Sequence, residues 1–230
     1  MLQFDQLRLS LEAIRVHERD SLDFLRGLEV SDLVSALEEI LNSPKLLSQV
    51  AADSYIHQLK FEKYVVIKSM SGKWLRIHHW PICIENDYQD IHSHCASFAS
   101  RLLTGALSHK HYRRRPGARF TEYRYSFDEL TGIGESLYHG KTDLMSSDGD
   151  NLCAGDVYYV DATLLHQVSR AEAGTITVSL WDKRMKEAEV FKPAFNLIPL
   201  RSAKSGLDMQ TLTAGLSNIV QKLKEANGLI

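Results

Sequence analysis

The chain has 230 residues, 44% of them hydrophobic, and a formal net charge of −2. This length and composition predict a soluble globular protein with a sizeable core, and the near-neutral charge argues against a nucleic-acid or anionic membrane partner. An odd number of cysteines without a CxxC pair, and a start without a basic-then-apolar leader, predict a reduced, cytoplasmic location. No apolar run approaches the ~20 residues that cross a membrane.

The first part of the chain has the pattern of helices. Apolar residues recur at helical spacing over 33–41, with Ser31 placed to cap that helix. The Asn-Ser-Pro at 42–44 should end it and begin another helix that runs through Val50.

From Lys63 the pattern changes to that of strands. YVVIKS and KWLRIHHW, on either side of Ser71-Gly72, predict a hairpin. Strand-like segments continue as SRLLTG, ALSHKHY, RFTEYRY, ESLYHG, DVYYVD, HQVSR and TITVSLW. A final helical stripe covers 212–223 and ends at Asn227-Gly228. We therefore expect a mainly β fold, an antiparallel sandwich or barrel, with helices from both ends covering its outer surface or an edge.

Two pairs of histidines have the spacing of metal ligands. His92 and His94 are two residues apart, so in a strand both imidazoles point to one face and can chelate an ion, although a polar strand face with two histidines gives the same pattern. His109 and His111 repeat the spacing beside RRRPG, which is typical of a solvated turn. We expect this second pair to be exposed.

Two segments together resemble the motifs of the cupin superfamily. IHSHCASFASRLLTG holds His92, His94 and Gly105 at the spacing of the first motif, with Phe98 at the position of its glutamate. GDVYYVDATLLHQVSR keeps the spacing of the second motif, with a glycine first and His166 at its histidine. The resemblance covers about Lys60 to Phe195.

The resemblance implies a double-stranded β-helix, or jelly-roll, barrel with a metal ion held by His92, His94 and His166. It divides the chain into an N-terminal helical segment that packs on the barrel (1–59), the cupin barrel (60–198), and a C-terminal linker and helix (199–230). Imidazole suits Fe(II), Cu, Ni and Zn, and a set of three leaves positions open. A set without carboxylate leaves the ion's charge undiminished, which favours anionic donors such as thiolate or carboxylate.

The surroundings of the site are similar to those of the cysteine dioxygenase-like thiol dioxygenases. The hairpin KYVVIKSMSGKWLRIHHWP precedes the HxH, and an SF pair, LLTG and a late TVSLW strand follow it. Family members bind a small thiol on Fe(II) and add both atoms of O2 to its sulfur. In this chain Phe98 stands at the family's cysteine, Lys68 at its carboxylate-binding arginine, and Ser179, Trp181 and Lys183 at its Ser-His-Tyr trio, which argues against cysteine itself as substrate.

The sequence therefore predicts a mononuclear non-haem Fe(II) dioxygenase, or another divalent-metal enzyme, that acts with O2 on a small anionic or thiol-containing substrate. Tyr159, in the strand that leads to His166, is the candidate catalytic residue. The candidate substrate-binding residues are Lys68, Arg76, His78, Phe98, Ser179 and Trp181.

Two alternatives remain open from the sequence. A metal-dependent lyase or isomerase would use the same three histidines to hold a Lewis acid without O2, and a non-enzymatic cupin would serve as a sensor or binding module. The expected partners are the small molecule and O2, with no nucleic acid and no membrane, and apolar barrel faces with terminal helices are compatible with a homodimer.

Overall fold

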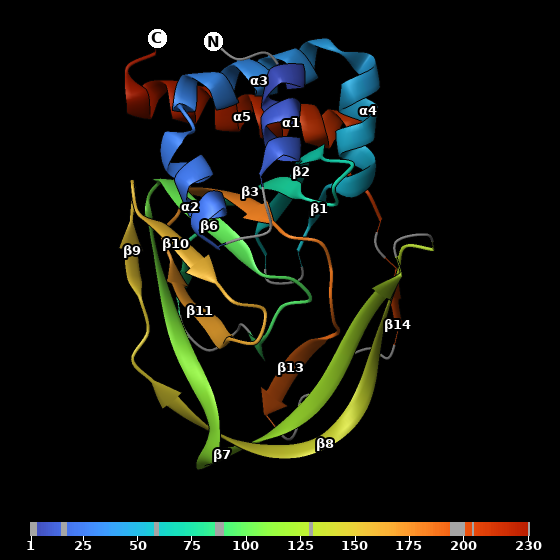
Figure 1. Ribbon diagram of the computed structural model, residues 1–230, viewed down its shortest axis with the longest axis vertical. Coiled ribbons are helices and arrows are strands. Elements are labelled where there is room, and N and C mark those ends of the chain that lie inside the picture. The colour runs from blue at the N-terminus through green and yellow to red at the C-terminus, as the bar shows by residue number, and fades with distance from the viewer. Residues whose placement is uncertain are drawn as a thin grey trace.

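The computed structural model of the protein describes residues 4–14, 18–57, 60–85, 90–128, 131–193, 201–203 and 205–229. Its helices are α1 (Phe4–Ala13), α2 (Glu18–Gly27), α3 (Val30–Asn42), α4 (Pro44–Asp53) and α5 (Met209–Asn227). Helices from both ends of the chain gather over one end of the molecule, where α5 lies against α3 and α4 (Figure 1).

The strands form two antiparallel sheets. The first sheet has the order β1-β2-β3-β12-β6-β10, and the second has the order β14-β8-β7-β13-β5-β11-β4, with β9 paired to β7. The strands of the first sheet are β1 (Tyr55–Ile56), β2 (Glu62–Lys68), β3 (Trp74–Trp80), β6 (Phe98–Thr104), β10 (Val157–Val160) and β12 (Thr175–Trp181). Those of the second are β4 (Ile84–Glu85), β5 (Ile91–His92), β7 (Ala106–Asp128), β8 (Ile133–Ser147), β9 (Asn151–Cys153), β11 (Leu165–Ala171), β13 (Ala188–Pro193) and β14 (Arg201–Ala203).

The path of the chain between the sheets defines a jelly roll. After β3 the chain crosses to β4 and β5, returns to β6, crosses to β7, β8 and β9, and then alternates through β10, β11, β12 and β13. Neighbouring strands in each sheet, such as β3 and β12, are therefore far apart in sequence. The predicted mainly β, double-stranded β-helix barrel with flanking helices is confirmed.

Alternation along the strands gives the first sheet two different faces. Ile77 of β3 and Val178 and Leu180 of β12 point outward and belong to one hydrophobic cluster with Leu37 of α3 and Leu216 of α5. The residues between them point into the barrel, because successive side chains of a strand alternate in direction. The helical layer thus covers the outer face of this sheet and leaves its inner face to the site.

Local signals explain the helix ends with one exception. Ser43 caps α4, since its hydroxyl accepts from the N–H of Leu46 and Pro44 occupies the first turn. Gly228 ends α5 at φ 63°, in the left-handed region. The prediction that Ser31 caps α3 was wrong, because the cap position is Glu29, one residue before the helix.

The structure contains the predicted hairpin at Ser71-Gly72, but it does not contain the turn predicted at RRRPG. β2 and β3 pair across Ser71-Gly72 as expected, with Gly72 at φ 86°. In contrast, ALSHKHY and RFTEYRY are parts of one continuous strand, β7, whose pairing with β8 shifts register between Arg114 and Ala118. The chain bends there without turning back (Figure 1). Glycine is needed at position 117, because the Cβ of any other residue would overlap the carbonyl oxygen of Leu144.

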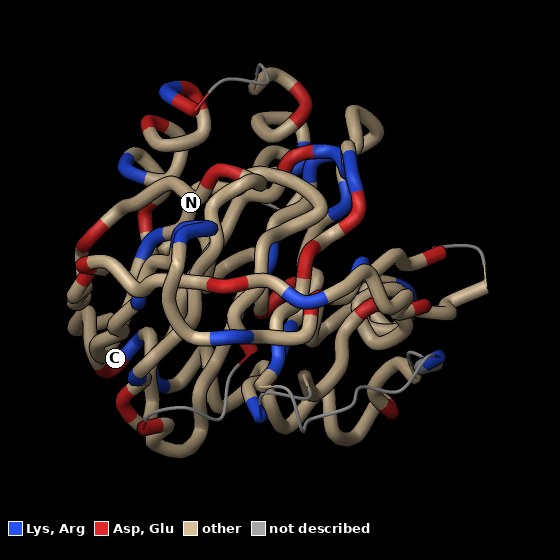
Figure 2. The backbone as a smooth tube through the Cα atoms, turned by 90° about the horizontal axis from the view of Figure 1, so that it is seen from below, with Lys and Arg blue, Asp and Glu red and all other residues tan. Residues whose placement is uncertain are grey.

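Lys, Arg, Asp and Glu residues are interspersed along the described backbone, as Figure 2 shows from the end opposite the helices. The described helices include none that is long and apolar enough to cross a membrane.

Candidate metal centre

Three histidines from two separate segments of the chain meet inside the barrel. His92 lies in β5, His94 follows it by two residues, and His166 lies in β11 directly opposite His92 in the antiparallel pairing. Directly opposed residues in such a pair project to the same face of the sheet. The N–H of His94 donates to the carbonyl oxygen of Ala162 (3.3 Å), which joins the HxH segment to the loop that leads into β11.

The three imidazoles are spaced as ligands of one ion. The Nε2 atoms of His94 and His166 are 2.8 Å apart, and one nitrogen from each of the three residues lies within 4.8 Å of the others. The ring centroid of His92 lies 4.8 Å from that of His94 and 4.9 Å from that of His166. Nitrogen donors about 2.0–2.1 Å from one ion lie roughly 3 Å apart, so small side-chain shifts suffice for this set to fit a transition-metal ion.

The orientation of His92 is fixed by a hydrogen bond behind the cluster. Its Nδ1–H donates to the backbone carbonyl oxygen of Asp90 (2.8 Å). This bond leaves Nε2 deprotonated and directed away from Asp90, the arrangement in which a histidine binds a metal.

Burial keeps the imidazoles neutral. Burial lowers the pKa of His94 and His166 well below 6.5, and the neighbouring imidazoles add to the effect. Burial also lowers the pKa of His92, against a smaller opposing effect of its bond to Asp90. Neutral imidazole is the form that donates a lone pair to a metal.

His92 also lines a cavity of about 650 Å³, together with several basic and aromatic side chains. The Arg76 guanidinium lies 4.2 Å from the ring centroid of Trp181 and 4.8 Å from that of Trp74. Lys63 also lines the cavity, where its Nζ donates to the Tyr55 hydroxyl (3.1 Å). Arginine stacked on aromatic faces keeps its planar edge available for a carboxylate.

Carboxylates also line this cavity, and two of them pair with lysines. Asp53 pairs with Lys68 at 2.6 Å, and Asp90 pairs with Lys192 at 2.8 Å. Arg184 adds another guanidinium, 4.8 Å from the ring of Phe127. Lys63, Tyr55 and Arg184 were not singled out from the sequence, since only the folded barrel brings their separate segments together.

Phe98 forms an apolar wall against the cluster. Its ring stacks on Trp181 at 4.1 Å and meets His94 edge-on at 5.0 Å. Trp181 lies 5.1 Å from His94, and its Nε1–H donates to the hydroxyl of Ser179 (2.9 Å). The structure thus brings Phe98 and Trp181 to the histidines and places Ser179 behind Trp181, where it holds the indole.

The remaining candidates lie farther from the three histidines. Lys68 is at the cavity mouth, 40% exposed and paired with Asp53. His78 packs against Phe61 and Trp80 at centroid distances of 5.2 and 6.1 Å. Neither is brought into contact with the histidine cluster.

Tyr159 does not reach the cluster either. It packs against the hydrophobic core beneath the helices, because β10 directs it to the outer face of the first sheet. Tyr158, its neighbour, points inward and meets the ring of His109 at 5.4 Å. Alternation along one strand therefore selects Tyr158 as the tyrosine of the interior.

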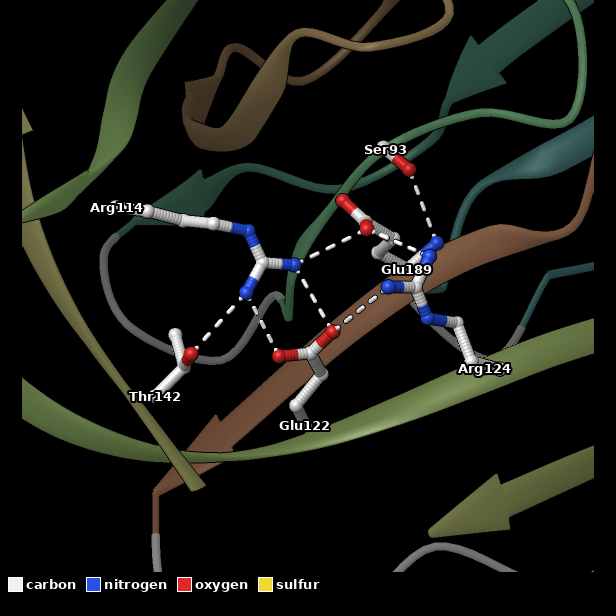
Figure 3. A network of polar contacts seen from close by, with 6 residues as sticks. All are labelled: Ser93, Arg114, Glu122, Arg124, Thr142 and Glu189. Atoms are coloured by element: carbon white, nitrogen blue, oxygen red, sulfur yellow. Dashed lines mark hydrogen bonds and ion pairs between the residues drawn. The ribbon is translucent and has the colours of Figure 1, made fainter. Parts of the chain in front are cut away.

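The HxH segment is anchored by a charged network (Figure 3). Ser93, between the two histidines, accepts from the N–H of Glu189 (2.9 Å), and its own N–H donates to the Glu189 carbonyl oxygen. The Glu189 carboxylate pairs with Arg114 and Arg124, and both arginines also pair with Glu122. These bonds join β5, β13 and β7 and so fix the backbone that carries His92 and His94.

The expectation that the second histidine pair is exposed was wrong for His109. This residue is 5% exposed, and its ring centroid lies 4.9 Å from that of His166. Burial lowers the pKa of His109 to about 3. The burial of His109 could not be predicted from the sequence, because the neighbouring RRRPG resembles a turn whereas the strand continues through it.

Fold and site together define a jelly-roll barrel with a cluster of three neutral imidazoles, fit for a transition-metal ion, in its interior. No protein-family model matches the chain, and no curated protein matches it.

Several solved structures are distantly similar to the chain. A Streptomyces PAC13 variant with uridine is 8% identical, with 70% of this chain and 91% of that chain covered and a TM-score of 0.31. Hydroxypropylphosphonic acid epoxidase from S. wedmorenis is 10% identical (78% and 96% covered, TM-score 0.31). An oxalate oxidase is 14% identical (69% and 64% covered, TM-score 0.28). Similarity this distant does not assign an activity to this chain.

Proposed function

We propose that this protein is a mononuclear non-haem iron oxygenase that acts with O2 on a small anionic or thiol-containing substrate. The observation that carries the proposal is the convergence of His92, His94 and His166 beside a cavity with basic and aromatic walls. Fe(II) held by these imidazoles would supply a redox-active Lewis acid with coordination positions left for substrate and O2.

The chain's own residues position the substrate and keep water out. Arg76, held between Trp74 and Trp181, can receive a carboxylate through two parallel hydrogen bonds. The other end of a small molecule anchored there can lie towards His92, which lines the same cavity. Binding both reactants in one cavity lowers the entropic cost of their encounter.

Phe98 and Trp181 restrict the substrate around His94. Their stacked rings occupy one side of this imidazole, so the reacting group must approach from the cavity side. An apolar wall also excludes water from the reacting group.

Oxygen uptake tests the proposal. The purified chain, loaded with Fe(II) without air, is mixed with small mercaptocarboxylic acids, simple thiols and hydroxy acids, and O2 consumption is followed with product analysis. At least one compound should support catalytic uptake, and His94→Ala should lower the rate by more than ~100-fold, since changes even behind a metal ligand cost 10- to 100-fold.

His139→Ala is the matched control, because His139 is exposed on β8. It should retain the full rate. Equal rates in His94→Ala and the control would refute the proposed centre. Turnover of a compound without O2 would instead assign the site to a metal-dependent lyase or isomerase.

A further inference from the structure

A second group of metal-binding side chains lies beside the three-histidine cluster. His109 and His111 are on β7, and Asp150 is in the loop between β8 and β9. One nitrogen or carboxylate oxygen from each residue lies within 4.8 Å of the others. His109 is buried, His111 is partly buried, and the Asp150 side chain is 52% exposed. The group therefore reaches from the interior of the barrel to the surface.

The backbone holds Asp150 in place. β8 pairs with β7 as far as Ser147, and β9 resumes the pairing at Asn151, so the residues between them bulge opposite His109. The N–H of His109 donates to the Asp150 carbonyl oxygen (2.8 Å). A Cβ on Gly149 would overlap the His109 carbonyl oxygen, so only glycine permits this close approach. The backbone of Asp150 is therefore held against β7, next to His109.

The polar atoms of the group are spaced for an ion. Nε2 of His111 is buried and lies 3.3 Å from Oδ2 of Asp150, yet it makes no hydrogen bond to any described residue. Two donors held tetrahedrally at 2.0–2.2 Å from one ion are roughly 3.3–3.6 Å apart. The two atoms thus have the separation of two ligands of one ion.

We propose that His109, His111 and Asp150 form a second site for a divalent transition-metal ion. Two imidazoles and one carboxylate suit Fe(II), Co(II) and Zn(II), and the carboxylate gives this set a negative charge that the three-histidine set lacks. The site opens at the surface through Asp150, which provides an entry path independent of the 650 Å³ cavity.

The two sites share a wall of the barrel. His111 is directly opposite His166 in the pairing of β7 with β11, and the rings of His109 and His166 are 4.9 Å apart. An ion in the second site therefore fixes the side chains that pack against His166. It also ties the Asp150 loop to β7.

Metal stoichiometry tests the inference. The full chain is stripped with a chelator and dialysed against micromolar CoCl2, and bound cobalt is measured by elemental analysis and visible absorption. The unmodified chain should bind two equivalents. Asp150→Asn should bind one, and its matched control Asp148→Asn, which changes an exposed carboxylate of the same loop, should bind two.

Two further variants separate the sites. His92→Ala should retain one equivalent and lose the other, and the double variant His92→Ala with Asp150→Asn should bind none. Asp150→Glu, which keeps the carboxylate, should restore the second equivalent, and circular dichroism verifies that each variant is folded.

Several outcomes decide the matter. One equivalent in the unmodified chain that disappears in His92→Ala overturns the second site, as do two equivalents in Asp150→Asn. One equivalent that disappears in Asp150→Asn and survives in His92→Ala supports the second site and refutes the three-histidine centre.

Discussion

At the scale of single residues, Arg76 is the side chain that we propose to bind the carboxylate of the substrate. It is 5% exposed, and its guanidinium lies against two indoles inside the cavity. A lysine there would keep the charge but lose the planar stacking and the paired donors.

Arg76→Lys should therefore weaken the binding of small mercaptocarboxylic acids about tenfold, the effect of losing roughly 1.4 kcal/mol. Calorimetric titration measures it. Lys68→Ala serves as comparison, since Lys68 is 40% exposed and paired with Asp53, and should change affinity less than twofold. Equal losses in the two variants would show that the anion is held at the cavity mouth.

The residues that could be predicted from sequence are those whose placement is local. The HxH pair follows from the alternation of side chains along a strand, whereas His166 was predicted from the resemblance to the second cupin motif, and the structure places it opposite His92. The choice between Tyr158 and Tyr159 depends on which face of β10 turns inward, and both have the same strand pattern. The sequence alone could not settle that choice.

At the scale of the elements, β5 is too short to hold the HxH segment alone. The segment is also held through Glu189, which pairs with Arg114, and Arg114 in turn pairs with Glu122. The Glu122 side chain is 4% exposed and accepts from both terminal nitrogens of Arg114, at 2.7 and 2.9 Å. These hydrogen bonds lower the pKa of Glu122, against the opposing effect of burial.

Glu122→Gln should destabilise the protein by about 2 kcal/mol at pH 7, the magnitude of hydrogen bonds to a charged group. Because the folded-state pKa lies below the ordinary 4.5, the stabilisation is complete above that pH and is lost as the pH falls through the folded-state pKa. Urea unfolding from pH 7 to pH 3 should show the difference shrinking. Glu135→Gln, at a 40% exposed carboxylate, should show almost no difference.

The docking of α5 on the first sheet depends on Gly215. A Cβ there would overlap the hydroxyl of Tyr64, which is 1% exposed and donates to Glu62 (2.9 Å). Alanine in a helix is favoured over glycine by about 1 kcal/mol, whereas overpacking a core costs roughly 1–3 kcal/mol.

Gly215→Ala should therefore lower the free energy of unfolding by about 1 kcal/mol. Ser217→Ala, at an exposed position of the same helix, should leave it unchanged or slightly higher. Thermal or urea unfolding distinguishes the two. A more stable Gly215→Ala variant would mean that α5 shifts without cost.

The length of β7 shows why the bounds of some strands could not be predicted from the sequence. Arg113 to Gly117 have the composition of a turn, yet pairing with β8 on both sides of the bend keeps the strand continuous. Long-range pairing overrides local propensity there. The apolar stripes of α3 and α5 are local, and these two helices were predicted from sequence.

At the scale of the whole molecule, the alternation of the chain between two sheets also governs when the site can exist. His94 and His166 are 72 residues apart in sequence and meet only when β5, β11 and β13 have joined the second sheet. Contacts of such long range form slowly, because the entropy of closing the intervening loops is lost before the contacts form.

The order of events in biosynthesis follows from this. A nascent chain that has emerged only as far as β10 has the HxH pair without His166 of β11, so it lacks the complete three-histidine set. Refolding the stripped chain with Co(II) present should therefore show cobalt absorption growing only in the last kinetic phase seen by tryptophan fluorescence. A metal ion bound by the three histidines would then be captured only in the last step of folding.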